Sequence, residues 1–241
     1  MASYTALETL IHQRRSVRKY DQQHQFNHDS VQRALELATL SPNSSNMQLW
    51  QFHRVIDADK KAALAKICMN QNAAKTANEL VVFVTTPTDW KQRAENNAKH
   101  IRDSFNGRTD KAALGAYKYY EKLIPFLYNN DRFGLYGMGR KVMSFVMGFK
   151  RPMVREVAKS DVHATLHKSS SLAAMTFMLA MTEQGYDTCP MEGFDSNKAK
   201  KLLGLPSNVD ITMIISCGKR TDEGVYGERQ RVENDSVIFK H

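Results

Sequence analysis

The segment RRSVRKYD, residues 14–21, holds four basic residues and one serine within eight positions. In an extended segment alternate side chains share a face, so Arg14, Ser16 and Arg18 would point the same way. Two guanidinium groups and a hydroxyl suit a phosphate, because the guanidinium fork matches phosphate oxygens. A solvated basic surface after a helix is the alternative, and the spacing alone leaves both open.

A second basic pair lies near the C-terminus, in the segment GERQRVE at residues 227–233. Arg229 and Arg231 alternate nearly as Arg14 and Arg18 do, so both pairs could close on one phosphate. A free, solvated tail would show the same pattern.

Two further segments could present polar groups to a ligand. The segment SPNSSNMQLWQF, residues 41–52, offers short polar side chains between an expected helix and an expected strand, namely Ser44, Ser45, Asn46 and Gln48. In GYDTCPMEGFD, residues 185–195, Pro190 and Gly193 favour an unusual backbone path that could turn N–H groups toward a ligand. Each segment alone is also typical of an ordinary turn.

These four segments, in this order, resemble the FMN-dependent nitroreductase family. That family has a helix followed by Arg-x-Ser-x-Arg/Lys, then a Ser-Pro-x-x-x-Asn-x-Gln-Pro-Trp loop, a Pro-x-x-Gly-Phe turn and a final basic pair. The match covers roughly residues 5–86 and 163–233. Leu49 stands where the family usually has proline, and residues 87–160 match no family pattern.

The resemblance implies an oxidoreductase that passes hydride from NAD(P)H, through N5 of FMN, to nitroaromatic, quinone or similar small oxidants in a ping-pong cycle. It implies a homodimer with FMN at the interface. It implies that a backbone N–H at Glu192 or Gly193 bonds flavin N5. It also implies an amide near the flavin ring, from Asn72 or from its neighbour Asn70. The implied cofactor-binding residues are Arg14, Arg15, Ser16, Arg18, Ser44, Asn46, Gln48, Asn72, Pro190, Met191, Glu192, Gly193, Arg229 and Arg231, with the partner chain's site as the alternative for Ser44.

Other readings stay open beside this one. A flavin-binding or flavin-handling module, or a reductive dehalogenase, could use the same fold. His163 and His167 lie four residues apart with Asp161 nearby, a spacing that zinc sites use, but no HExxH motif is present and we expect no metal. Cys189 has no activating base beside it in the sequence, so we interpret it as a small packing residue.

Composition narrows the class of protein. The chain has 241 residues and a formal net charge of +9, which favours anionic partners, yet no nucleic-acid-binding motif is evident. No apolar run is long enough for a transmembrane helix. The three widely spaced cysteines and the absence of a signal-peptide pattern predict a cytoplasmic protein.

The expected elements mix helices and strands without a regular βαβ rhythm, which predicts an α+β fold. The resemblance adds a central mixed sheet flanked by helices and a long buried helix at a dimer interface. Hydrophobic periodicity predicts helices over residues 5–14, 30–40, 57–69 and 168–184, with Ser30 as an N-cap, and strands over 50–56, 80–86 and 210–218.

We expect one domain, residues 1–241, with a variable helical insertion at about 88–160. Within that insertion the apolar segment VMSFVMGF, residues 142–149, is flanked by Arg140, Lys141, Lys150 and Arg151. Its length excludes a membrane span. We expect a buried helix or a lid over a pocket there, with contact to a membrane surface as the alternative.

Overall fold

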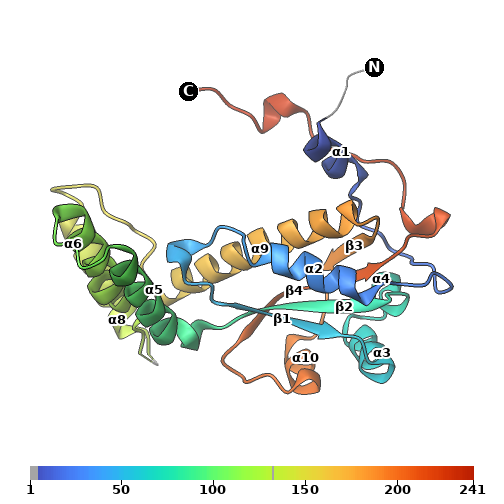
Figure 1. Ribbon diagram of the computed structural model, residues 1–241, viewed down its shortest axis with the longest axis horizontal. Coiled ribbons are helices and arrows are strands. Elements are labelled where there is room, and N and C mark those ends of the chain that lie inside the picture. The colour runs from blue at the N-terminus through green and yellow to red at the C-terminus, as the bar shows by residue number, and fades with distance from the viewer. Residues whose placement is uncertain (1–4, 132) are drawn as a thin grey trace.

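The computed structural model describes residues 5–131 and 133–241 and centres on a four-stranded sheet (Figure 1). Its strands run in the order β1-β2-β4-β3 and pair antiparallel. They are β1 (Trp50–Val55), β2 (Glu79–Thr85), β3 (Asp187–Met191) and β4 (Asp210–Gly218). The predicted α+β class is confirmed. The one parallel pairing among the described residues is an isolated bridge between Ser16 and Thr188, so the sheet is mixed only through that bridge.

Helices surround the sheet and occupy most of the remaining chain. They are α1 (Ala6–Gln13), α2 (His28–Ala38), α3 (Ala58–Ile67), α4 (Asn72–Lys75), α5 (Trp90–Ser104), α6 (Lys111–Lys118), α7 (Ile124–Tyr128), α8 (Leu135–Met147), α9 (Lys159–Glu183) and α10 (Ser196–Leu203). A π-helical stretch, Tyr119–Leu123, joins α6 to α7, and short 3₁₀ turns lie at Ser44–Asn46, Pro87–Asp89, Asp222–Gly224 and Asn234–Ser236.

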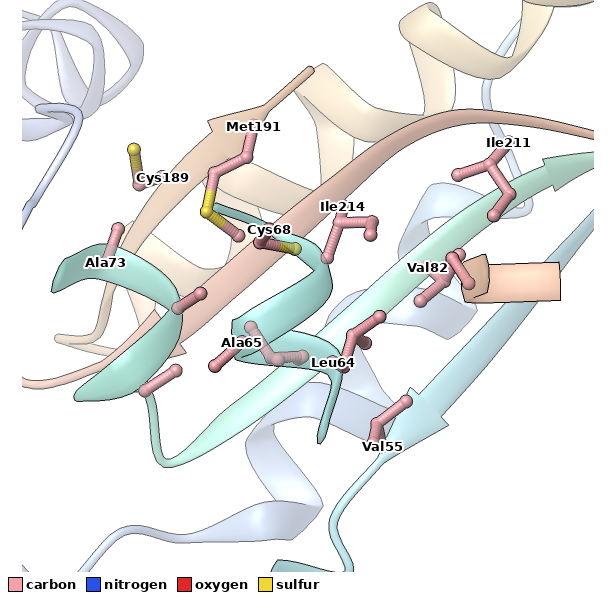
Figure 2. Close-up of a cluster of buried hydrophobic side chains, with 14 of the residues drawn as sticks. Val55, Leu64, Ala65, Cys68, Ala73, Val82, Cys189, Met191, Ile211 and Ile214 are labelled. Carbon is pink, nitrogen blue, oxygen red and sulfur yellow. The ribbon is translucent and has the colours of Figure 1, made fainter. Parts of the chain in front are cut away.

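Strand β2 is buried along its whole length and separates two hydrophobic layers. Because strand side chains alternate between faces, Leu80, Val82 and Val84 enter one cluster while Val81 and Phe83 enter the other. The first cluster packs the sheet against α3, α4 and α10, and Figure 2 shows part of it. The second packs the opposite face against α2 and α9. The sheet is therefore covered by helices on both faces.

The segment after α9 corrects one sequence expectation. Residues 187–191 were expected to belong to a turn, yet they form the edge strand β3, in which Pro190 pairs with Ile215. Proline is tolerated there because an edge strand has one side without ladder partners. Helix α10 follows, which the periodicity also did not predict, and Asp195 caps it by accepting from Lys198 N at 3.0 Å.

Two helix starts also differ from expectation. Helix α2 begins at His28, and its N-cap is Asn27, whose Oδ1 accepts from Asp29 N at 3.0 Å. Ser30 is not the cap and lies buried within the helix. Helix α9 begins at Lys159 rather than Lys168, because Asp161 accepts the Ala158 N–H at 2.8 Å and stabilises an earlier first turn.

The helices expected between residues 88 and 160 are present as α5 to α8. In Figure 1, α5, α6 and α8 gather at the end of the molecule away from α3 and α4. A third hydrophobic cluster joins this group to α9 and to the loop before β1, through Met47, Leu49, Ala94, Ile124, Tyr128 and Leu166. The division into one domain with an insertion at about 88–160 stays a prediction.

Candidate functional site

The basic segment after α1 is held in an extended form against β3. Val17 N donates to Thr188 O at 3.1 Å, and Arg18 N donates to the carbonyl oxygen of Gly224. Val17 and Tyr20 are buried, whereas Arg14 and Arg18 are only partly covered. The expected alternation holds only in part: Val17 is buried between Ser16 and Arg18, but Tyr20, which would share the face of Arg14, Ser16 and Arg18, is buried as well. The side chains of Arg14 and Arg18 remain partly exposed.

The two basic pairs predicted from the sequence meet at one cavity of about 270 Å³. Its lining residues are Arg14, Arg15, Ser16, Arg18, Val225, Tyr226, Glu228, Arg229, Gln230 and Arg231. Five of these residues are arginines, and Glu228 is the one carboxylate among the described residues that line the cavity. We call this the arginine cavity. Its excess of positive charge favours an anionic ligand.

The electrostatics of Arg14 show how closely the cations are packed. Burial lowers the pKa of its guanidinium, and the neighbouring charges of Arg229, Arg231 and Arg15 lower that pKa further. Like charges gathered around a partly buried group disfavour its charged form. A bound anion would offset this repulsion, which is the electrostatic condition that a phosphate site requires.

The C-terminal segment reaches the cavity because Arg229 binds the end of α1. Its Nη2 donates to the carbonyl oxygens of Ile11, His12 and Arg14 at 3.2, 3.1 and 2.6 Å. These include carbonyls that a helix leaves unpaired at its C-terminal end. Arg15 adds a second link by donating to Gly227 O at 2.8 Å. The segment that carries the second basic pair is thereby fixed beside the first.

The predicted turn after β3 lies near the start of α4. Gln71 Nε2 donates to Gly193 O at 2.9 Å, and a Cβ added at Gly193 would lie 3.2 Å from that nitrogen. Glu192 and Gly193 are exposed, so their backbone groups can reach a ligand. Met191 instead directs its side chain into the hydrophobic core, as Figure 2 shows, so only its backbone could contact one.

Asn72 reaches the arginine cavity indirectly. Its Nδ2 lies 3.4 Å from the hydroxyl of Tyr226, and Tyr226 lines the cavity. Asn70, the alternative named from the sequence, has a left-handed backbone (φ 54°) in the loop before α4. Residues 70–72, the 192–193 turn and the arginine cavity thus form one continuous region.

The polar loop before β1 lies elsewhere in the chain. Ser44 N donates to Ser169 Oγ at 3.2 Å, in the middle of α9, and Gln48 N donates to Asn43 Oδ1 at 2.8 Å. Asn46 and Gln48 both have positive φ, which favours a loop shaped by these bonds. None of Ser44, Asn46 and Gln48 lines the arginine cavity. The predicted site residues therefore form two separate groups within one chain.

Sequence reasoning missed three residues that this region uses. Gln71 and Tyr226 hold the two loops described above. Thr188 Oγ1 is buried without a hydrogen-bond partner among the described residues, and its residue is bridged to Ser16. Each lies within three residues of a predicted site residue, but polar residues near motifs are too common for proximity to identify them.

The sequence places Asp161 near His163 and His167 as a candidate third metal ligand, but the structure brings Asp210 next to the two histidines instead. His163 Nε2 lies 2.9 Å from Asp210 Oδ2, and His167 Nδ1 lies 3.0 Å from Thr212 Oγ1. The ligand atoms of His163, His167 and Asp210 all lie within 4.8 Å of one another. Asp161 is used at the start of α9 instead.

Cys189 is buried, and burial raises the pKa of its thiol. A buried thiol with a raised pKa is a poor nucleophile at neutral pH. This agrees with its interpretation as a packing residue in the cluster that Figure 2 shows.

Comparison with known proteins identifies the family. The model of the nitroreductase family matches residues 11–219, so the chain belongs to that family, as the motifs predicted. The oxygen-insensitive NADPH nitroreductase of Helicobacter pylori (strain ATCC 700392 / 26695) is 35% identical over 227 residues, covering 92% of this chain and 90% of that protein. A Bacillus subtilis (strain 168) protein named "Putative NAD(P)H nitroreductase MhqN" is 25% identical over 223 residues, covering 92% and 91%.

Solved structures show the same fold. A structure described as a "putative nitroreductase in complex with FMN", from Exiguobacterium sibiricum 255-15, superposes with a TM-score of 0.69 at 22% identity and covers 99% of each chain. The confirmed family and the shared fold together place this chain among the nitroreductases.

Proposed function

We propose that this protein is an FMN-dependent oxidoreductase that takes hydride from NAD(P)H and delivers it to a nitroaromatic, a quinone or a similar small oxidant. It is an enzyme of the nitroreductase family, whose members use FMN with NAD(P)H. The observation that carries the proposal is the arginine cavity, where five guanidinium groups face a single carboxylate.

The donors of the arginine cavity fit a phosphate-bearing cofactor. Arg14, Ser16 and Arg18 would bind the phosphate from the segment after α1, and Arg229 and Arg231 would bind it from the C-terminal segment. Guanidinium groups can donate two parallel hydrogen bonds to such a group. Backbone bonds to β3 fix the first segment, and bonds from the Arg229 side chain to the end of α1 fix the second, so little ordering should accompany binding.

When bound, FMN supplies the hydride chemistry, and the protein supplies binding, orientation and electrostatics. The exposed backbone N–H of Glu192 or Gly193 would orient the reactive edge of the flavin. Gln71 holds the Gly193 carbonyl, so it would keep this turn in place. Asn72, with Tyr226 beside it, would contribute an amide near the ring.

We also propose a homodimer with FMN at the interface. Ser44, Asn46 and Gln48 lie apart from the arginine cavity, so they could complete a site only on a partner chain. Helix α9 leaves Leu172 and Met175 exposed on a face that its own chain does not cover. The apolar end of the chain, residues 237–239, is also exposed and leaves the body of the molecule beside α1 (Figure 1). Apolar surfaces of this kind mark interfaces.

None of the helices in the described part of the chain combines the length and hydropathy needed to span a bilayer. We propose a cytoplasmic location, supported by three cysteines that are free and buried.

The test is the visible spectrum of the purified protein, with the released chromophore identified by chromatography, followed by stopped-flow mixing with NADH and with NADPH. We expect FMN, bleaching by a nicotinamide donor, and recovery of the colour with a nitroarene or a quinone. A protein that stays colourless after incubation with FMN would overturn the proposal. Bound FMN that no donor reduces would instead favour a flavin-handling module.

A further inference from the structure

Helix α8 has the reverse of the usual arrangement for a helix at a protein surface. Its buried residues are small or polar, namely Gly137, Arg140 and Ser144. Its large apolar residues point outward, as does Phe149 just beyond its end, and the following have 57–77% of their surface exposed: Leu135, Met138, Val142, Phe145, Val146 and Phe149. An ordinary surface helix buries such residues and exposes its polar ones. Of the two uses expected for residues 142–149, the buried helix is therefore wrong, and the lid over a pocket stays a prediction.

Polar contacts fix this orientation. Arg140 is buried, and its guanidinium donates to the carbonyl oxygens of Val157, Phe126 and Asn129 at 2.9–3.0 Å and to Asn130 Oδ1 at 2.6 Å. A rotation that buried the apolar face would break these four bonds and expose the groups that they satisfy.

Packing and a further hydrogen bond fix the same orientation. A Cβ at Gly137 would lie 3.1 Å from Lys159 N, so glycine permits a close approach to the start of α9. Arg155 also donates to Ser144 O at 2.8 Å and ties the segment after α8 to it. The outward apolar face is thus a fixed feature of the fold.

The exposed charges of α8 and of the segment that follows it are mostly basic, while Asp131 at the start of α8 accepts from Tyr136 N at 2.9 Å and Glu156 is exposed just beyond the segment. Residues 133–155 contain five basic residues and no acidic one. Lys141, Lys150 and Arg151 are exposed beside the apolar side chains.

A groove of about 490 Å³ runs along the helix, lined by Pro125, Phe126, Asn129, Leu135, Tyr136, Gly139, Arg140 and Met143. In Figure 1, α8 lies at one end of the molecule, and the sheet lies toward the centre.

We propose that residues 135–151, named here the α8 face, form a docking surface for an anionic phospholipid membrane. Exposed Phe, Val, Leu and Met side chains can enter the boundary between headgroups and acyl chains, while flanking Lys and Arg bind anionic headgroups. The groove beside α8 offers an apolar channel that an acyl chain can enter. With 13 residues the helix is too short to span a bilayer, so it would lie in the plane of the interface.

A second copy of this chain is a weaker occupant on the same observations. A symmetric dimer contact places the same patch of both chains together. If α8 of one chain met α8 of the other, exposed Lys141, Lys150 and Arg151 of both chains would meet, which is unfavourable. An anionic membrane supplies the missing negative charge. This docking requires neither flavin nor a hydride donor. Membrane binding can therefore fail while the proposed oxidoreductase activity holds, and the activity can fail while membrane binding holds.

The test is co-sedimentation of the full-length protein with vesicles of phosphatidylcholine alone and of phosphatidylcholine with 30% phosphatidylglycerol. We expect binding to the anionic vesicles that weakens at high salt. The charge variant Lys141→Gln/Lys150→Gln/Arg151→Gln should lower the partition coefficient about 100-fold. The apolar variant Val142→Ser/Phe145→Ser/Phe149→Ser should also abolish binding. All six positions are exposed, so both variants should fold, which thermal unfolding would verify.

Matched controls replace equally exposed residues elsewhere. Lys60→Gln/Lys66→Gln/Lys201→Gln removes three positive charges, and Leu40→Ser/Met69→Ser removes apolar surface, and both should leave vesicle binding unchanged. As an independent readout, the emission of Phe145→Trp should shift to the blue with anionic vesicles, whereas that of Leu40→Trp should not. Absence of binding to anionic vesicles would overturn the proposal. So would an apolar variant that changes the oligomeric state and leaves vesicle binding intact.

Discussion

A single residue, Arg14, gives the most direct test of the arginine cavity. Arg14→Ala should weaken FMN binding by about 1.5–3 kcal/mol, because a hydrogen bond to a charged group contributes that much. The measurement is FMN affinity by fluorescence quenching of the apoprotein. Arg33→Ala removes an exposed arginine of α2 that does not line the cavity, and it should leave the affinity unchanged. Equal affinities in Arg14→Ala and the parent protein would remove this residue from the site.

A second residue-scale prediction concerns stability at alkaline pH. Burial raises the pKa of Cys68 from 9.0 to about 11. The unfolded thiol therefore loses its proton at lower pH than the folded one, and stability falls as pH rises from about 9 to 11. Its contribution is fully present below pH 9 and amounts to about 2–3 kcal/mol. Urea unfolding at pH 8 and pH 10.5 should show a smaller loss for Cys68→Ala than for the parent protein. Equal losses in both proteins would contradict the prediction.

At the same scale, alternation was only a partial guide to the basic segment. Arg14, Ser16 and Arg18 line the arginine cavity and Val17 between them is buried, but Arg15 lines the cavity too and Tyr20 is buried, which strict alternation does not predict. The side chain of Met191 could not be assigned in the same way. The motif places it next to the turn, but whether it faces a ligand or the core depends on the packing of α3 and α4 against the sheet, which is far away in sequence.

At the scale of elements, one buried carboxylate joins α2, β1 and β2. Glu79 is fully buried and accepts from Arg54 Nε at 2.6 Å, and its Oε2 lies 2.7 Å from His28 Nδ1. Arg54→Leu would remove the guanidinium partner of the buried Glu79 carboxylate and should lower the free energy of unfolding by about 3–5 kcal/mol. The double variant Arg54→Leu/Glu79→Leu should recover most of that loss, because it removes the charge as well. A double variant as unstable as the single one would contradict this account.

Elements with strong periodicity were the predictable ones. Strand β4 was expected at 210–218 and is present there, because its apolar run is bounded by polar residues. Strand β3 was missed because it contains proline and has only five residues, and its pairing with β4 is a non-local contact. The orientation of α8 was not predictable either, since it depends on carbonyl groups that Arg140 meets only after α7 and the start of α9 have packed beside it.

At the scale of the whole molecule, the separation of Ser44, Asn46 and Gln48 from the arginine cavity makes assembly testable. A protein whose cofactor site needs residues of two chains should bind FMN poorly as a monomer. The variant Leu172→Glu/Met175→Glu places two carboxylates on the exposed face of α9 and should produce monomers with little bound FMN.

The control for assembly is Ile56→Glu, which charges an equally exposed apolar position at the end of β1 and should stay dimeric and yellow. Light scattering coupled to gel filtration gives the mass, and absorbance gives the FMN content of the same peak. The mass tests whether the protein is a dimer, and the FMN content tests whether the cofactor site needs both chains. A parent protein that is monomeric and fully loaded with FMN would contradict the shared site while leaving the arginine cavity as the phosphate-binding region. A monomeric variant that loses FMN although Arg14 and Arg229 are unchanged would show that the cavity alone is not sufficient, and that the loop of a partner chain completes it.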